Sequence, residues 1–138
     1  MRLTNFTDYG MRMLMRMAAD PERTYSAAEL ATELKLSRHH LQKIIQRLVD
    51  GGVLTTQRGN AGGARFAHAP SKFKVGEVVR LLERDQPLVE CLAESPCSCS
   101  IEDGCRLKVR LRRAERAFTD DLNKSTLQDI ALNNGSAV

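Results

Sequence analysis

All four cysteines of the 138-residue chain lie in one stretch, residues 90–105, with the sequence ECLAESPCSCSIEDGC. This stretch has no helical or strand periodicity, and its cysteines are mixed with Glu, Ser, Pro, Asp and Gly. Cysteines that only pack would be scattered over apolar helix faces, whereas thiolates in one polar loop can converge on a single point. The pattern favours a metal or cluster site, with a redox dithiol as the second interpretation and structural cysteines as the third.

The spacing of the cysteines limits what they could bind. Five residues separate Cys91 from Cys97, one separates Cys97 from Cys99, and five separate Cys99 from Cys105. The absence of a C-x2-C pair counts against structural zinc. Iron–sulfur clusters accept thiolates at irregular spacings within one loop, and a cubane takes four ligands. Either the four cysteines hold a cluster alone, or three of them do so with a ligand from elsewhere.

Charge is unevenly distributed along the chain. Residues 1–70 carry ten Lys and Arg against six Asp and Glu, whereas residues 71–138 carry eleven of each. A basic first half indicates a polyanion as its partner. The sequence contains no run of eighteen apolar residues and no signal-peptide pattern at its N-terminus, so we expect a cytoplasmic protein without membrane association. No nucleophile–base pair, paired carboxylates or nucleotide-binding loop indicates an enzyme.

The first half predicts a helix-turn-helix. Amphipathic periodicity occurs over about 5–19, 27–34 and 38–49. Each of these stretches follows a residue that can cap a helix, namely Thr4, Ser26 and Ser37. Only three residues separate the second stretch from the third, and the outer face of the third is polar and basic, with no acidic residue before Asp50. Those features are typical of a DNA-reading helix.

A small β-hairpin should follow as a wing. Residues 53–57 and 64–67 read as strands around the glycine-rich turn RGNAGG, whose Gly59, Gly62 and Gly63 would let the backbone approach a DNA groove. Arginines at both shoulders could pair with phosphates or enter a narrow minor groove. The residues predicted to contact DNA are Ser37, Arg38, His39, His40, Gln42, Lys43, Arg58 and Arg65.

The second half predicts a helix for pairing two subunits. A short packing helix within 71–85 precedes the cysteine stretch, and a long, highly charged helix follows from about 105 to 123. One apolar stripe along that helix is typical of a dimerisation seam, although it could instead pack only on its own domain. The stripe consists of Leu107, Leu111, Ala114, Phe118 and Leu122. A capping-box pattern at Thr126 and Asp129 predicts one more short helix.

The expected fold is therefore mainly α with a small β-hairpin wing. A winged helix-turn-helix domain would span 1–85, a cysteine loop 86–105, and a dimerisation helix with its tail 106–138. One face of the first helix is unusual, because it carries Asp8 among Met11 and Met15. We expect this face to be covered by another part of the protein or by a second subunit.

Four stretches carry a resemblance that spans nearly the whole chain: LTNFTDY at 3–9, RGNAGG at 58–63, KVGEVVRLLE at 74–83 and CRLK at 105–108. Together with the cysteine loop, they resemble the iron–sulfur winged-helix transcription regulators that include the nitric-oxide-sensing repressor NsrR and the cluster-assembly regulator IscR. The assembly regulators use a His three residues after the last cysteine. Lys108 stands at that position here, so the nitric-oxide-sensing branch fits better.

The resemblance implies a homodimer in which three cysteines of one subunit and an Asp of the other hold each cluster. Carried over to this sequence, the ligands are Cys91, Cys99 and Cys105 with Asp8 of the partner subunit, and Cys97 is the alternative to Cys99. The implied cofactor is a 4Fe-4S cluster in preference to 2Fe-2S. The implied function is a DNA-binding repressor that responds to nitric oxide. Alternatives are a sensor of iron, cluster supply or redox state, and a thiol-redox or zinc-containing interaction module.

Overall fold

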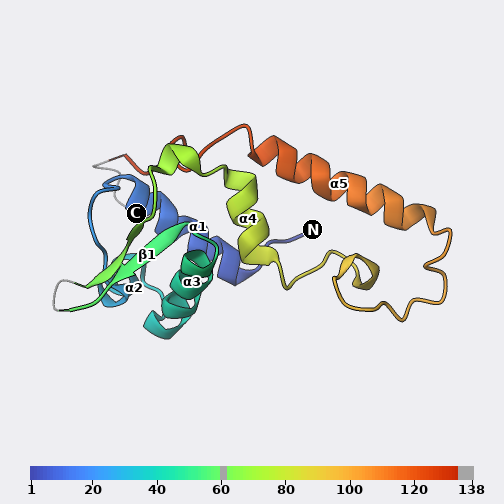
Figure 1. Cartoon of the computed structure of the whole chain (residues 1–138), viewed down its shortest axis with the longest axis horizontal. Helices are drawn as coiled ribbons and strands as arrows, with labels where there is room; N and C mark the ends of the chain where they lie inside the picture. The colour runs from blue at the N-terminus through green and yellow to red at the C-terminus, as the bar shows by residue number, and fades with distance from the viewer. Residues whose placement is uncertain (60–61, 134–138) are drawn as a thin grey trace.

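The computed structural model describes residues 1–59 and 62–133 (Figure 1). Within them the chain forms the helices α1 (Asn5–Ala18), α2 (Ala27–Leu34), α3 (Arg38–Asp50), α4 (Val75–Glu83) and α5 (Arg106–Leu122), and the antiparallel strands β1 (Leu54–Gln57) and β2 (Gly63–Phe66). Short 3-10 turns lie at Pro70–Lys72 and Glu90–Leu92. The predicted class, mainly α with a hairpin wing, is confirmed. No helix in the described ranges is both long enough and apolar enough to cross a membrane.

The three predicted helix caps are confirmed. The side-chain oxygens of Thr4, Ser26 and Ser37 accept hydrogen bonds from the backbone N–H three residues onward, at 3.2, 3.1 and 3.4 Å. These bonds satisfy donors that the first turn of a helix leaves free. Between α2 and α3, Lys35 adopts the left-handed conformation with φ of 55°, which ends α2 and turns the chain sharply into α3.

A single apolar core joins α1, α2, α3 and the hairpin. Its largest fully buried side chains include Tyr25, Met13, Leu14, Met17, Leu30, Leu41, Ile44 and Leu48. Each such side chain stabilises the fold by roughly 1.5–3 kcal/mol relative to exposure. The core therefore fixes the orientation of α3, which buries one face and leaves the other to solvent.

The hairpin pairs Leu54 with Phe66 and Gln57 with Gly63, one residue earlier on the returning strand than predicted. Tyr25 extends this sheet, because its N–H and C=O both bond Ala64 at 2.8 Å. A side chain at Gly63 would put its Cβ 2.3 Å from the Tyr25 carbonyl oxygen. The internal contact gives Gly63 a structural reason, and the approach of this turn to DNA stays a prediction. Residues 60–61 of the predicted turn lie outside the described residues.

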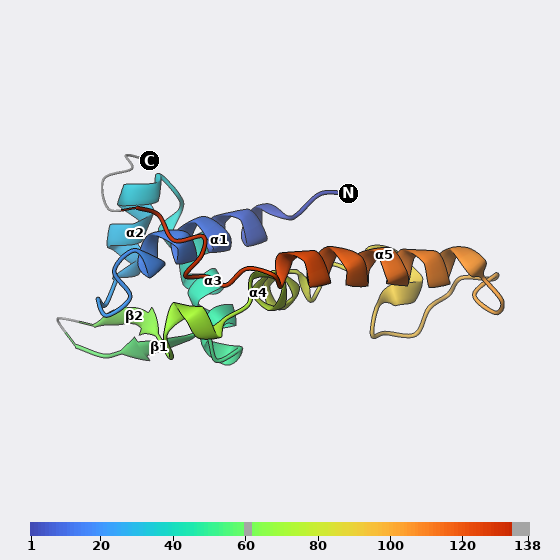
Figure 2. The same ribbon diagram turned by 90° about the horizontal axis from the view of Figure 1, so that it is seen from above.

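The C-terminal end of α5 is fixed to α4. Asn123 Oδ1 accepts the Glu77 N–H at 3.0 Å, and the Val75 N–H donates to the Ser125 carbonyl at 2.9 Å. The tight fit requires Gly76, whose added Cβ would lie 2.3 Å from the Thr119 carbonyl oxygen. From this junction toward its N-terminal end, α5 extends away from the winged helix, as Figure 2 shows.

The prediction of a short helix beginning at Thr126 is wrong. The two reciprocal bonds of a capping box do form, from Thr126 N to Asp129 Oδ2 at 2.6 Å and from Asp129 N to Thr126 Oγ1 at 3.4 Å. They close only a turn, because the chain then crosses to α1, where the Leu132 N–H bonds the Met15 carbonyl at 3.0 Å. This segment of the same chain therefore covers one end of the unusual α1 face, on which Met11 and Met15 are half-buried.

Candidate DNA-binding face and cysteine site

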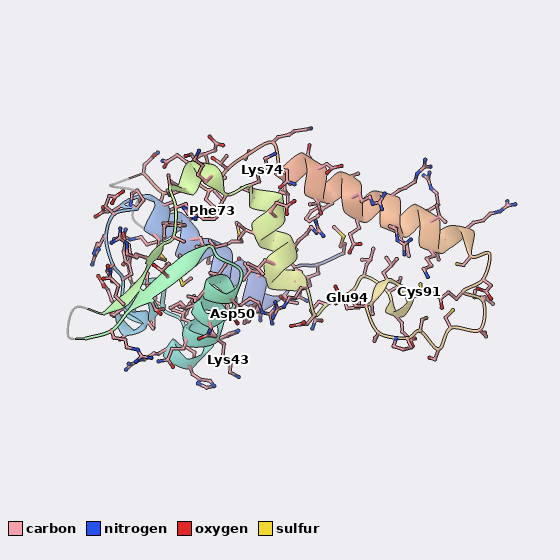
Figure 3. The ribbon with its side chains drawn as sticks, viewed as in Figure 1. Lys43, Asp50, Phe73, Lys74, Cys91 and Glu94 are labelled. Carbon is pink, nitrogen blue, oxygen red and sulfur yellow. The ribbon has the colours of Figure 1, made fainter. Side chains whose placement is uncertain are left out.

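The outer face of α3 presents donors and acceptors, and the helix carries no acidic residue before Asp50. The side chains of Arg38, His39, Gln42 and Lys43 are exposed. Figure 3 shows Lys43 on the part of α3 far from α5. Asp50, at the end of the helix, accepts a bond of 2.9 Å from the Gln46 side chain. This face therefore has the chemistry to meet base edges and phosphates.

His40 differs from the other predicted DNA contacts, because it is half-buried against α1. Its ring lies edge-on to Tyr9, with centroids 5.3 Å apart, and 5.9 Å from the ring of Phe6. The sequence could not separate His40 from His39, since both precede the first buried residue of α3. The structure assigns one histidine to packing and leaves the other exposed.

The two wing arginines are positioned differently. Arg58 directly follows β1 and is exposed. Arg65 lies within β2, paired across the hairpin with Thr55, and its guanidinium is 3.9 Å from the Glu22 carboxylate. At that distance an exposed ion pair contributes little, so the Arg65 side chain can turn toward another anion.

The cysteine loop runs beside the N-terminal half of α5, and Cys91 lies on its short 3-10 turn (Figures 1 and 3). All four thiols are free. Cys105 caps α5, since its Sγ accepts the Lys108 N–H at 3.4 Å, and Cys97 Sγ accepts the Cys99 N–H at 3.3 Å. Hydrogen bonds from backbone N–H groups to sulfur are among the interactions that tune iron–sulfur clusters.

Carboxylates shape the electrostatics of the loop. Lys108 forms an ion pair with Glu102, and the hydrogen bond in that pair raises the pKa of Lys108. The N–H of Cys99 acts to lower the pKa of Cys97, but desolvation and the nearby charges of Glu102 and Glu90 outweigh it, so that the pKa is raised. Glu90 also ties the loop together, because it accepts bonds from the Ser98 N–H and hydroxyl at 3.3 and 2.7 Å.

The donor set fits an iron–sulfur cluster, because thiolates are the ligands that such clusters take. Within the described parts of this single chain, however, no three His, Cys, Asp or Glu side chains gather closely enough to hold a metal ion. Asp8 is instead bound by Arg12 on its own helix, at 2.6 and 3.1 Å. To complete such a site, the loop would have to close, either on all four thiolates or on three of them with a ligand from elsewhere.

A partly buried polar contact that the sequence did not predict joins two of the motif stretches. Glu83, the last residue of α4, accepts hydrogen bonds from the Thr4 N–H at 2.8 Å and the Thr4 hydroxyl at 2.7 Å. Burial acts to raise the pKa of Glu83, but hydrogen bonds from Thr7 and Thr4 outweigh it and hold the pKa below its usual value. Thr4 and Thr7 belong to the stretch LTNFTDY, and Glu83 belongs to KVGEVVRLLE. That all three lie in stretches that carry the family resemblance is the one sequence signal that could have indicated this contact.

Fold and site together define a winged-helix transcription regulator with an appended cysteine loop. A family model described as Rrf2, iron-dependent transcriptional regulator, matches residues 3–133. The chain therefore belongs to the Rrf2 family, whose members are transcription regulators.

Solved structures agree with this assignment. The chain is similar to CymR (YrzC), the global cysteine regulator of B. subtilis, with 26% identity, 95% of this chain and 96% of that chain covered, and a TM-score of 0.69. It is also similar to a putative transcriptional regulator from Listeria innocua, with 30% identity, 94% and 85% coverage, and a TM-score of 0.68. T. potens IscR matches in fold, with 23% identity, 94% and 85% coverage, and a TM-score of 0.70.

Proposed function

We propose that the protein is a homodimeric, DNA-binding transcriptional repressor whose operator affinity is controlled by a nitric-oxide-sensitive 4Fe-4S cluster. The observation that carries the proposal is a division of chemistry along the chain. One part of the chain presents the basic outer face of α3, and another carries four free thiols in a loop beside α5. A basic DNA-binding face and a site with soft thiolate ligands on the same regulator are consistent with control of DNA binding by iron chemistry.

The α3 face would read the major groove. Lys43 is suited to guanine O6 and N7, and Gln42 to adenine N6 and N7. Ser37, Arg38 and His39, at the start of α3, can contact phosphates and fix the register of the helix on the duplex. Arg58 and Arg65 would place the wing on the backbone or in the minor groove. His40 would act indirectly, by holding α3 against α1.

The cluster would be held by Cys91, Cys99 and Cys105, with Cys97 as the alternative to Cys99, and by Asp8 of the partner subunit. When bound, the cluster supplies iron atoms that react with nitric oxide. The chain's own groups would hold the sulfurs: the Lys108 N–H on Cys105 and the Cys99 N–H on Cys97. A carboxylate is a harder and weaker ligand for iron than a thiolate, which makes Asp8 the ligand most open to displacement.

The dimer would form along α5. Leu107 and Ala114 of the apolar stripe are exposed, and Leu111, Phe118 and Leu122 are only half-buried. Phe118 also lines an open groove of about 340 Å³ with Leu3, Val79 and Leu88. An apolar stripe continuous with an apolar groove on a charged helix is suited to a second copy of the same helix. Pairing there would bring the loop of one subunit near α1 of the other.

A second candidate is a regulator that reports iron or cluster supply through the same residues. The family description, iron-dependent transcriptional regulator, favours this reading. The two candidates differ in their signal. A nitric oxide sensor keeps its cluster under iron limitation and loses it to the gas, whereas a supply sensor changes occupancy with available iron.

The test uses full-length protein reconstituted anaerobically with ferrous iron and sulfide. Absorption and binding to a duplex that the protein selects from a random-sequence pool are followed together through stepwise nitric oxide addition. We expect the cluster absorption and the DNA affinity to fall together. Lys43→Ala with Arg65→Ala should weaken DNA binding and leave the cluster absorption unchanged. Cys105→Ser, which removes a proposed cluster ligand, should lower both the absorption and the DNA affinity. A colourless protein that binds DNA equally well before and after the gas would contradict the proposal.

A further inference from the structure

The cysteine loop carries one large apolar side chain in its exposed part. Ile101 is 68% exposed and lies between Ser100 and the acidic residues Glu102 and Asp103. This stretch lies at the end of α5 that is far from the winged helix (Figure 1). Single exposed apolar residues are common on protein surfaces, so the role of Ile101 depends on whether a complementary surface exists.

The groove between the N-terminal segment, α4 and α5 is such a surface. Its volume is about 340 Å³, and its apolar lining includes Leu3, Val79, Leu88 and Phe118. Leu3 and Leu88 are exposed, although both are large and apolar. An apolar cavity of about 150 Å³ already holds a molecule of the size of benzene. The groove therefore has room for a branched aliphatic side chain.

Ile101 of the same chain does not line this groove. The groove lies at Glu115 and Phe118, in the C-terminal half of α5, whereas the loop lies beside the N-terminal half of the helix. From its first residue, Arg106, to Phe118 the helix rises about 18 Å. Phe118 also belongs to the apolar stripe along which the dimer is proposed to form. The occupant that this arrangement favours is therefore a second copy of the chain.

The proposed ligand Asp8 limits where the loop of that second copy would lie. The Asp8 N–H bonds the carbonyl of Thr4, a residue of the groove, at 3.0 Å, so the two lie one helical turn apart, about 5.4 Å. Ile101 follows Cys99 by two residues, a span of at most about 7 Å. With Cys97 as the ligand, the span is at most about 14 Å. A loop that brings either thiolate to Asp8 of the partner subunit therefore brings Ile101 within reach of the partner's groove.

From these distances we infer that Ile101 anchors the cysteine loop of one subunit in the groove of the other. The inference rests on the proposed function, from which it takes the homodimer and the ligand role of Asp8. Two-fold symmetry makes the contact twice in each dimer. At the rim of the groove, Arg80 is exposed and only 3.9 Å from Glu77, so its side chain can turn toward Asp103 of the docked loop.

The anchor would act before any cluster is present. A loop that is already held at the partner subunit does not have to be ordered when its thiolates bind iron, and such preorganisation strengthens binding. Ile101 is thus a positioning residue for the thiolates. It touches neither iron nor sulfide, and its contact with the groove forms in cluster-free protein as well.

The first measurement locates position 101 in the dimer. A photoreactive benzophenone side chain is placed at position 101 of full-length, cluster-free protein, and light subunits are exchanged with ¹⁵N-labelled subunits. We expect cross-links between chains of different isotope content that end in residues 1–4, 79–88 or 115–119, which contain the groove. The same side chain at position 109, on another face of α5, is the control and should not reach the groove. Cross-links from position 101 that stay within one chain, or that avoid the groove, would overturn the inference.

The second measurement is the dissociation constant of the cluster-free dimer. Ile101→Ala should raise it by roughly 10- to 100-fold, because burial of an aliphatic side chain is reduced at two symmetric sites. Ser100→Ala, the matched control in the same loop, should change it by less than about 2-fold. Leu3→Ala in the groove should also weaken the dimer, and the double variant should weaken it by less than the product of the two single effects. Independent effects would show that the two side chains do not meet.

The third measurement separates the anchor from the proposed function. In reconstituted protein, Ile101→Ala should speed the loss of cluster absorption to a ferrous chelator by roughly 10-fold, as substitutions that disturb the orientation of metal ligands do. Loss at the wild-type rate would reject the positioning role while leaving the proposed function intact. A wild-type protein that takes up no cluster would reject the proposed function, whereas the cross-links and the dissociation constants would still decide whether Ile101 lies in the groove. Thermal unfolding confirms that each variant is folded.

Discussion

The winged helix and the cysteine loop with α5 are stabilised in opposite ways. In the winged helix, apolar side chains from α1, α2, α3 and the hairpin bury one another almost completely. Around the loop, by contrast, Ile101, Leu107 and Val109 are 68%, 63% and 57% exposed. The C-terminal end of α5 is hydrogen-bonded to α4 through Asn123 and Ser125. The winged helix satisfies its own contacts, whereas the cysteine loop and α5 leave apolar surface and free thiols exposed.

Because of this difference, we expect mutations in the two regions to have different effects. Substitutions in the winged helix should act on the stability of the single chain. Substitutions around the loop and along α5 should act on the proposed dimer and the proposed cluster, with little effect on the folding of one chain. Each of the following predictions tests one side of that contrast.

The largest effect is expected from Leu111→Glu on the apolar stripe of α5. A carboxylate at the centre of an apolar interface must be desolvated on both subunits, which should weaken the dimer by roughly 100-fold or more. The dissociation constant of cluster-free protein is measured by sedimentation. Val109→Glu is the matched control, because Val109 is an exposed apolar residue on the opposite face of the same helix. Equal weakening by both variants would place the interface elsewhere.

The second effect concerns the junction that anchors α5. Alanine at position 76 would put a methyl group 2.3 Å from the Thr119 carbonyl oxygen, so α4 and α5 would have to separate. Overpacking costs up to about 3 kcal/mol, and the better helix propensity of alanine offsets about 1 kcal/mol of that cost. We expect Gly76→Ala to lower the free energy of unfolding by about 2 kcal/mol in urea titrations followed by circular dichroism.

The control for this prediction lies in the other region. Ser95→Ala, in the exposed part of the cysteine loop, should change the same free energy by less than about 0.5 kcal/mol. If the two variants lowered the free energy of unfolding equally, the contrast between a self-contained winged helix and an open cysteine loop would fail.

The winged helix was predicted from the sequence more accurately than the rest of the chain, because its signals are local. Helix periodicity and capping residues are local signals, and Thr4, Ser26 and Ser37 each begin a helix as expected. Contacts between distant segments leave no periodic trace. The Tyr25 pairing that requires Gly63, the crossing of Leu132 to Met15 and the packing of His40 on α1 were all missed.

For the candidate site, the sequence located the cysteines but not their arrangement. Spacing shows that the four thiols share one loop, whereas their convergence depends on how that loop closes. The ligand roles of Cys91, Cys99, Cys105 and Asp8 follow from a resemblance and stay predictions. The ion pair between Asp8 and Arg12 is local, at i and i+4, and could have been read from the sequence.

The smallest effect tests how Glu83 joins α4 to the start of α1. Because its pKa in the folded protein is lowered, this carboxylate contributes stability that is fully present above its unfolded pKa, about 4.3, and is lost as pH falls through the folded value. Glu83→Gln should therefore cost about 1 kcal/mol at neutral pH. The difference from the wild type should shrink below about pH 4, where Glu83 itself becomes protonated. Urea unfolding at several pH values measures it, with Glu94→Gln, on the exposed loop, as the control that leaves stability unchanged. A difference that stayed constant down to acidic pH would mean that the Thr4 contact depends on shape rather than on the charge of Glu83.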